Sequence, residues 1–200
     1  MNYGETIAYW YLRLNGFFPL RNFVHHMPDD RDDRGDCDLV AVRFPHVSEE
    51  VGGAAGDFDA ERFALWGLPL PPPSTPVAPI VQVKTGERAD HGERAFGAAR
   101  VKGALQRIGL WPAEVVTQLA HDLKLAAHAT SDNARVGKLL IASHPCNHPA
   151  VHFTMSMNDA VRFIRARFDM YRDAKAADRL FFNDELIQFL ASVEDRDGRA

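Results

Sequence analysis

The fold of this chain is decided by two apolar runs, GDCDLVAVRF at residues 35–44 and PIVQVKT at residues 79–85. Both runs are predicted to be strands, the first of them beginning at Asp38. Side chains two positions apart in a strand point to the same face, so Gln82 and Lys84 project together. Asp38 stands at the start of the neighbouring strand, so its side chain can contact Gln82 and Lys84. A carboxylate, an amide oxygen and an ammonium clustered at a sheet edge indicate a divalent metal and a phosphate.

Length and composition indicate one globular domain with a substantial core. The chain has 200 residues, of which 46% are hydrophobic and 25% are charged. No apolar stretch approaches the length of a membrane span, and the N-terminus lacks the pattern of a signal peptide. Cys37 and Cys146 form no disulfide framework, so we expect a cytoplasmic protein with no membrane partner. The net charge of −4 argues mildly against a general nucleic-acid binder but leaves room for a local basic groove.

The hydrophobic pattern elsewhere predicts a series of helices and strands. Apolar residues three and four apart mark a first helix, and Gly16 is a signal for its end. Pro19 is expected to interrupt the first strand, and Asn158 is expected to be the N-cap of a long helix. The predicted strands cover residues 17–25, 38–44, 79–85, 136–143 and 150–157. The predicted helices cover residues 4–15, 93–108, 112–129, 158–176 and 180–193.

These elements predict a single α/β domain over residues 1–200. Residues 45–78 form an insertion that is rich in glycine, proline and acidic residues. Part of it, residues 58–66, could form a short helix. Residues 158–193 are expected to be a helical extension at the C-terminal end.

The polar cluster suits the hydrolysis of a phosphodiester. That reaction needs an activated water and shielding of the phosphoryl oxygens, and Mg²⁺ supplies both when a few oxygen ligands leave positions open. Asp38 would be the first ligand, the side-chain oxygen of Gln82 the second and the backbone carbonyl of Val83 a third. Lys84 could orient or deprotonate the attacking water, or neutralise the phosphate. Glu5, on the first helix, could complete the shell directly or through water.

The order of a helix, a strand, an Asp-bearing strand and a strand with Gln-x-Lys resembles the PD-(D/E)XK nuclease superfamily. The match extends beyond these residues and is nearest to the Holliday-junction-resolvase-like and Mrr-type branches. The resemblance covers residues 4–44 and 79–86, and from 93 to 157 it rests on element order alone. It is carried by GETIA at 4–8, YL at 11–12, NGF at 15–17, RN at 21–22, GDCDLVA at 35–41 and VQVKT at 81–85.

This resemblance implies the restriction-endonuclease-like fold, in which helices flank a mixed central sheet of about five strands, with C-terminal helices added here. It implies a nuclease that depends on Mg²⁺ or Mn²⁺ and acts on DNA. Its catalytic residues would be Glu5, Asp38, Gln82 and Lys84, with Asp38, Gln82 and Glu5 as the metal ligands. By analogy with small nucleases, a homodimer is plausible.

Three departures from the family pattern bear on activity. Gln82 replaces the usual acidic residue, and one fewer negative charge should loosen the metal site. A Gln at this position also occurs in active Mrr-type relatives. The insertion at 45–78 is longer than usual in this branch, and Asp36 stands where the branch commonly has Glu.

Further basic and polar residues could contact the nucleic-acid backbone. In this fold, such groups often follow the third strand. Others lie beside the apolar seam of the long helix, where the alternative is a solvated face with Arg165 paired to Asp169. The candidates are Lys102, Gln106, Arg107, Arg162 and Arg165.

Other interpretations remain open. The same fold could serve a non-catalytic binding or scaffold protein whose insertion or C-terminal helices hold a partner protein, and the acidic balance and Gln82 favour this. An RNA-acting relative is a third interpretation. Zinc is a weak alternative, because the spacing of the residues concerned fits no usual zinc motif. Those residues are His144, Cys146, His148 and His152.

Overall fold

The computed structural model describes residues 2–23, 37–47, 56–86, 96–144, 151–171 and 184–192. The elements up to the middle of the chain are α1 (Tyr3–Leu14), β1 (Phe18–Phe23), β2 (Cys37–Val42), α2 (Ala60–Leu65), β3 (Val77–Lys84) and α4 (Ala98–Ile108). They are followed by α5 (Ala113–Leu125), β4 (His128–Thr130), β5 (Arg135–Ala142), β6 (Phe153–Ser156), α6 (Met157–Met170) and α8 (Glu185–Ser192).

The strands form a mixed open sheet in the order β1-β2-β3-β5-β4, with β6 also paired to β5. β1, β2 and β3 are antiparallel neighbours, whereas β3, β5 and β6 run parallel. β4 and β6 share one side of β5: β4 pairs with its first residues and β6 with its last. The carboxyl ends of β3, β5 and β6 therefore lie at the same edge as the start of β2.

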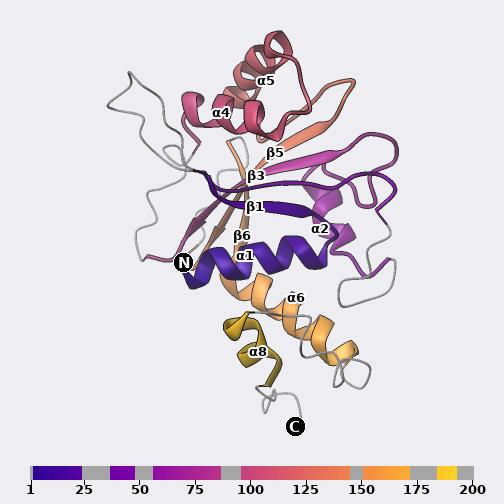
Figure 1. The fold of residues 1–200 in the computed structure, drawn as a ribbon, viewed down its shortest axis with the longest axis vertical. Coiled ribbons are helices and arrows are strands. Elements are labelled where there is room, and N and C mark those ends of the chain that lie inside the picture. Colours follow the sequence, from indigo (N-terminus) through magenta and orange to yellow (C-terminus); the bar gives the residue numbers. More distant parts are fainter. Residues whose placement is uncertain are drawn as a thin grey trace.

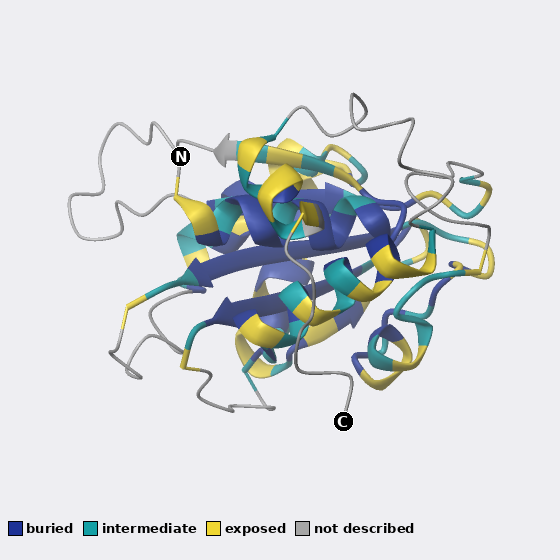
Figure 2. Cartoon of the chain, turned by 90° about the horizontal axis from the view of Figure 1, so that it is seen from below, coloured by how far each residue is buried: buried dark blue, intermediate teal, exposed yellow. Residues whose placement is uncertain are grey.

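Helices cover the two faces of the sheet in separate layers (Figure 1). α1, α6 and α8 lie on one side, where Val81, Val83 and Ile141 pack with Leu12 and Ile164. α4 and α5 lie on the other side over a second apolar cluster. Figure 2 shows the buried strands enclosed between helices whose outer surfaces are exposed. The predicted α/β class with a mixed sheet flanked by helices is confirmed, with six described strands where about five were expected.

The insertion contributes to the core as well as to the surface. The helix expected within residues 58–66 is α2, and its Phe63 is fully buried. The Phe63 ring stacks on Phe17 and Tyr11, at centroid distances of 5.2 and 6.1 Å. The Tyr11 hydroxyl donates to Asp59 Oδ2 at 2.8 Å, and burial together with this carboxylate raises the pKa of Tyr11 well above its usual value. The part of the insertion from Asp59 to Phe63 is thus fastened to α1.

Several predicted boundaries were wrong, each for a local reason. Pro19 does not interrupt β1 but pairs with Ala41, because an edge strand tolerates a missing N–H. The helix expected to run to residue 129 ends at Leu125, and the chain then becomes extended and forms β4.

Other boundaries differ near the C-terminal end and around β3. The N-cap of α6 is Ser156, whose hydroxyl accepts the Asp159 N–H at 3.0 Å, and not Asn158. α6 ends at Met170 and α8 begins at Glu185, so both are shorter than expected. β3 begins at Val77, two residues inside the expected insertion. Some residues of predicted elements lie outside the described residues, namely 24–25, 93–95, 150, 172–176, 180–183 and 193.

A buried arginine fixes the turn between α1 and β1. Arg43 is 1% exposed, and its Nη1 donates to the carbonyl oxygen of Asn15 at 2.6 Å. The guanidinium also lies 4.0 Å from the centroid of the Phe58 ring. Gly16 has a φ of +77°, and a Cβ placed on it would overlap Arg43 Nη1. Both the backbone and the close guanidinium therefore require glycine at this turn.

We expect Gly16→Ala to lower the free energy of unfolding by about 3 kcal/mol or more, because it adds a clash with a buried cation to the strain of a positive φ. Gly109→Ala is the matched control. Gly109 has a φ of +73°, but the nearest atom to its Cβ would be 3.9 Å away. Its loss should be about 1–2 kcal/mol, from backbone strain alone. Urea denaturation of both variants measures the difference, and equal losses would contradict this account.

A second buried cation lies on the α4 and α5 side of the sheet. Lys138 is 1% exposed, and its ammonium donates to the carbonyl oxygen of Leu123 in the last turn of α5. Its Nζ is 5.9 Å from the centroid of the Phe96 ring. Burial lowers the pKa of Lys138 to about 8. The Lys138 ammonium compensates the negative end of the α5 dipole. Its burial costs the free energy of hydration that the charge would have in water.

This pKa predicts a rise in stability at alkaline pH. Below pH 8 the lysine is protonated in both states, so the cost of burying the charge is fully present. Between pH 8 and about 10.4, the unfolded chain keeps the proton that the folded chain has released, so stability rises with pH. Relative to Lys138→Met, the wild type should gain up to about 3 kcal/mol between pH 7 and pH 10.5. Urea midpoints at both pH values test this, and a constant difference between the two proteins would contradict it.

Candidate functional site

β2 and β3 separate at one end, and a side chain takes over their pairing there. The pairs run from Val40 with Ile80 to Leu39 with Val81. At the next position, Asp38 Oδ2 accepts the N–H of Val83 at a distance of 2.6 Å. A carboxylate thus replaces the strand carbonyl that would otherwise accept this bond. The result is a fork between β2 and β3 whose inner side carries a fixed negative charge.

The fork brings together three of the residues that the sequence indicated. Lys84 Nζ lies 3.3 Å from Gln82 Oε1 and 3.7 Å from Asp38 Oδ2. Gln82 is 1% exposed, whereas the side chains of Asp38 and Lys84 are 19% and 32% exposed. The cluster is therefore fixed on its inner side and reachable from solvent through Lys84.

These side chains lie on the α4 and α5 side of the sheet. Val40 and Ile80, which share their strand faces with Asp38 and Gln82, pack into the cluster beneath those helices. Val83 faces the opposite side, with α1. The polar cluster therefore lies at the end of an apolar sheet face, close to the first turn of α4.

The donor set fits a weakly held hard cation. The oxygens of Asp38 and Gln82 already converge on one cation, the Lys84 ammonium, as they would on Mg²⁺ or Mn²⁺. Only one of the two is charged, and water would have to fill most positions. A metal ion would also meet Lys84: unit charges 4 Å apart repel by about 4 kcal/mol at an effective dielectric of 20, and a divalent ion doubles this. Among the described residues there is no group of three or more His, Cys, Asp or Glu that could hold a metal.

Glu5 lies on the other side of the sheet from this cluster. α1 approaches the end of β3 so closely that a Cβ on Gly4 would lie 2.9 Å from Val83 Cγ1. Glu5 acts electrostatically on Arg21, whose guanidinium carbon is 3.4 Å from the centroid of the Tyr9 ring. Within the described part of the chain, Glu5 forms no ion pair with Lys84. The structure therefore brings three of the four expected catalytic residues together and places Glu5 on the other side of the sheet.

Arg100, in the first turn of α4, is a basic residue near the fork that the sequence pattern did not indicate. Burial above all, together with the charge of Asp38, raises the pKa of the Cys37 thiol to about 12, and Arg100 acts in the opposite direction. Arg100 precedes buried Ala104 by one turn, a spacing that could have indicated its orientation towards the sheet. The raised pKa and full burial of Cys37 are typical of a core residue and not of a nucleophile.

The other proposed nucleic-acid contacts do not gather around the fork. Lys102, Gln106 and Arg107 are exposed on α4. The remaining two lie on α6, on the opposite side of the sheet. There a cavity of about 260 Å³ is lined by Val161, Arg162, Arg165, Ala166 and Asp169.

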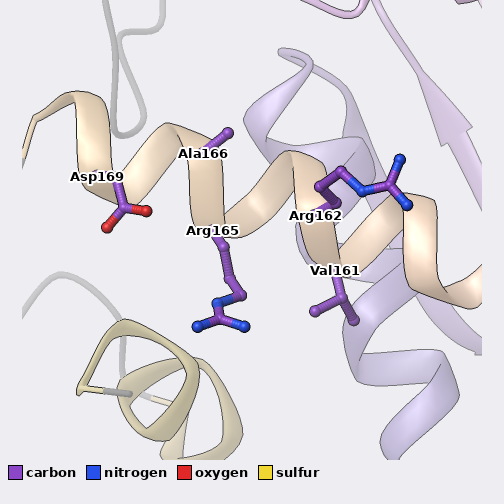
Figure 3. Close-up of a pocket in the computed structure, with 5 residues that line it drawn as sticks. All are labelled: Val161, Arg162, Arg165, Ala166 and Asp169. Atoms are coloured by element: carbon purple, nitrogen blue, oxygen red, sulfur yellow. The ribbon is translucent and has the colours of Figure 1, made fainter. Parts of the chain in front are cut away.

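The two arginines of α6 do not converge on one point. Figure 3 shows their guanidinium groups directed differently, that of Arg165 towards α8. Arg162 Nη1 pairs with Asp159 Oδ1 at 3.2 Å, an i,i+3 pair that belongs to a solvated helix face. These residues are therefore separate from the fork.

The residues weighed for zinc are only partly described. His144 is exposed, and His152 is buried with its ring centroid 5.5 Å from that of Phe96. Cys146 and His148 lie outside the described residues, as does Asp36.

Comparison of the chain with protein-family models, with curated proteins and with solved structures found no match. None of the helices in the described ranges has the length and apolar character needed to span a bilayer.

We expect the Asp38 carboxylate to stabilise the fork independently of any metal. Asp38→Ala leaves the Val83 N–H without its acceptor and should cost about 1–3 kcal/mol of unfolding free energy. Asp38→Asn retains an acceptor oxygen and should lose less. Hydrogen exchange at the Val83 amide should accelerate in Asp38→Ala and remain closer to wild type in Asp38→Asn. Equal exchange in all three proteins would show that the bond does not hold the strands.

Proposed function

We propose that this chain is a metal-dependent nuclease that hydrolyses phosphodiester bonds, with DNA as the favoured polymer. The observation that supports the proposal is that Lys84 Nζ lies within 3.7 Å of both Gln82 Oε1 and Asp38 Oδ2 at the fork. The choice of DNA rests on the resemblance of the motifs to the PD-(D/E)XK superfamily. The restriction-endonuclease-like fold itself belongs to the same proposal.

In this proposal Asp38 and Gln82 hold Mg²⁺ or Mn²⁺, which when bound would polarise a phosphoryl oxygen and lower the pKa of a coordinated water. The Val83 N–H keeps the Asp38 carboxylate in one orientation. Lys84, partly open to solvent, neutralises charge on the phosphate or positions the attacking water. Arg100 adds positive charge on the α4 side of the fork. The role of Glu5 as a metal ligand stays a prediction, since α1 lies on the other side of the sheet from the cluster.

A specific observation favours a second function, that of a non-catalytic binding protein on the same scaffold. The cluster contains one carboxylate, and the ammonium of Lys84 already compensates its charge. Such a site needs no metal to be electrostatically satisfied. It could still bind a phosphodiester through Lys84 without cutting it.

Cleavage assays distinguish the two functions. Purified protein is incubated in Mg²⁺ or Mn²⁺ with labelled duplex, single-stranded and branched DNA and with RNA. We expect cleavage of DNA that falls by at least about a thousandfold in Asp38→Asn and Lys84→Met, because both remove charge from the reacting centre. Lys124→Met, at an exposed position in the last turn of α5, is the charge-matched control and should retain activity.

Cleavage that persists unchanged in both site variants would refute the assignment of the active site. If the wild type binds these nucleic acids but cuts none of them, the binding function is favoured instead.

A further inference from the structure

We propose that Lys84 competes with the metal ion for its place, so that the site is closed by its own cation until a phosphodiester draws the lysine away. This inference rests on the proposed function and adds to it the order in which metal and substrate enter. It follows from which groups at the fork are fixed and which one can move.

The two oxygen donors are fixed. Asp38 Oδ2 is bound to the Val83 N–H at 2.6 Å, and the carboxylate cannot turn away without breaking that bond. The Gln82 side chain is 1% exposed, so the packing around it restricts its rotation. Both oxygens therefore keep facing the same point whether or not a cation is there.

Lys84 is the group that can move. Its side chain is 32% exposed, and four methylene groups let the ammonium swing outwards without disturbing β3. Its Nζ lies 3.3 Å from Gln82 Oε1 and 3.7 Å from Asp38 Oδ2. A bound Mg²⁺ lies about 2.1 Å from its oxygen ligands, so it would need the space that the ammonium fills. Metal and ammonium would therefore compete for the same space and would repel each other.

A phosphodiester changes this balance because it offers Lys84 a new anionic partner outside the fork. Once the ammonium pairs with the phosphate, Asp38 and Gln82 are left with a net charge of −1 and no cation. Metal affinity should then rise when substrate is bound, and by thermodynamic reciprocity substrate affinity should rise when metal is bound. The substitution of Gln82 for an acid strengthens this dependence, because a single carboxylate is easily satisfied by a single lysine.

The test is a Mn²⁺ titration followed by isothermal calorimetry, which needs no catalytic activity. We expect Lys84→Met to bind Mn²⁺ at least about tenfold more tightly than the wild type, since a competing unit charge has been removed. Lys84→Gln should behave in the same way, which guards against a folding defect in one variant. Lys84→Arg keeps the charge and should bind no more tightly than the wild type. Lys124→Met should bind like the wild type.

A second arm uses a short DNA with a non-cleavable phosphorothioate linkage. It should tighten Mn²⁺ binding to the wild type but have much less effect on Lys84→Met. If Lys84→Met and Lys84→Gln bind Mn²⁺ no more tightly than the wild type, the competition is refuted while a metal site remains. If no variant binds Mn²⁺ at all, or if Asp38→Asn binds as well as the wild type, the metal site of the proposed function fails, and the competition fails with it.

Discussion

The candidate site depends on one hydrogen bond, from the Val83 N–H to the Asp38 carboxylate. A backbone donor in a strand interior must find an acceptor, and here the acceptor is a charged side chain and not the neighbouring strand. This lets β2 and β3 part without leaving a buried donor unsatisfied. It also fixes the direction of a carboxylate at the end of a sheet. The geometry of Gln82 and Lys84 follows, because β3 carries them on the same face at the same point.

Two buried cations fix the strands and helices on either side of the fork. At the far end of β2, Arg43 joins the strand to the carbonyl of Asn15 beneath the turn at Gly16, so β2 cannot slide relative to α1. On the other face, Lys138 joins β5 to the end of α5. Both cations are buried and donate to carbonyl oxygens at the C-terminal ends of helices, so their role is structural. Lys84 differs from them because it is partly exposed and bound to groups that a ligand could also use.

The sequence predicted the parts of the fold that repeat regularly. The two apolar runs placed β2 and β3 within two residues, and the period of two along a strand put Gln82 and Lys84 on one face. It could not show that Asp38 would bond to a backbone N–H, because this depends on where two strands part. It also could not assign Glu5 to a side of the sheet. That position follows from how closely Gly4 lets α1 approach β3, which is a matter of packing. β4 has only three residues and carries too little pattern to be recognised.

The proline in β1 has a consequence for how copies of this chain can meet. Among the described strands β1 pairs only with β2, and Pro19 stays within that ladder, so its missing N–H belongs to the outer edge. A strand arriving from another molecule would find no donor at that position in a strand of six residues. Exposed Phe18 and Leu20 flank the same position, so this edge would otherwise be an aggregation hazard. Pro19 thus protects the protein in solution: it discourages strand-by-strand growth of the sheet at this edge without burying any surface.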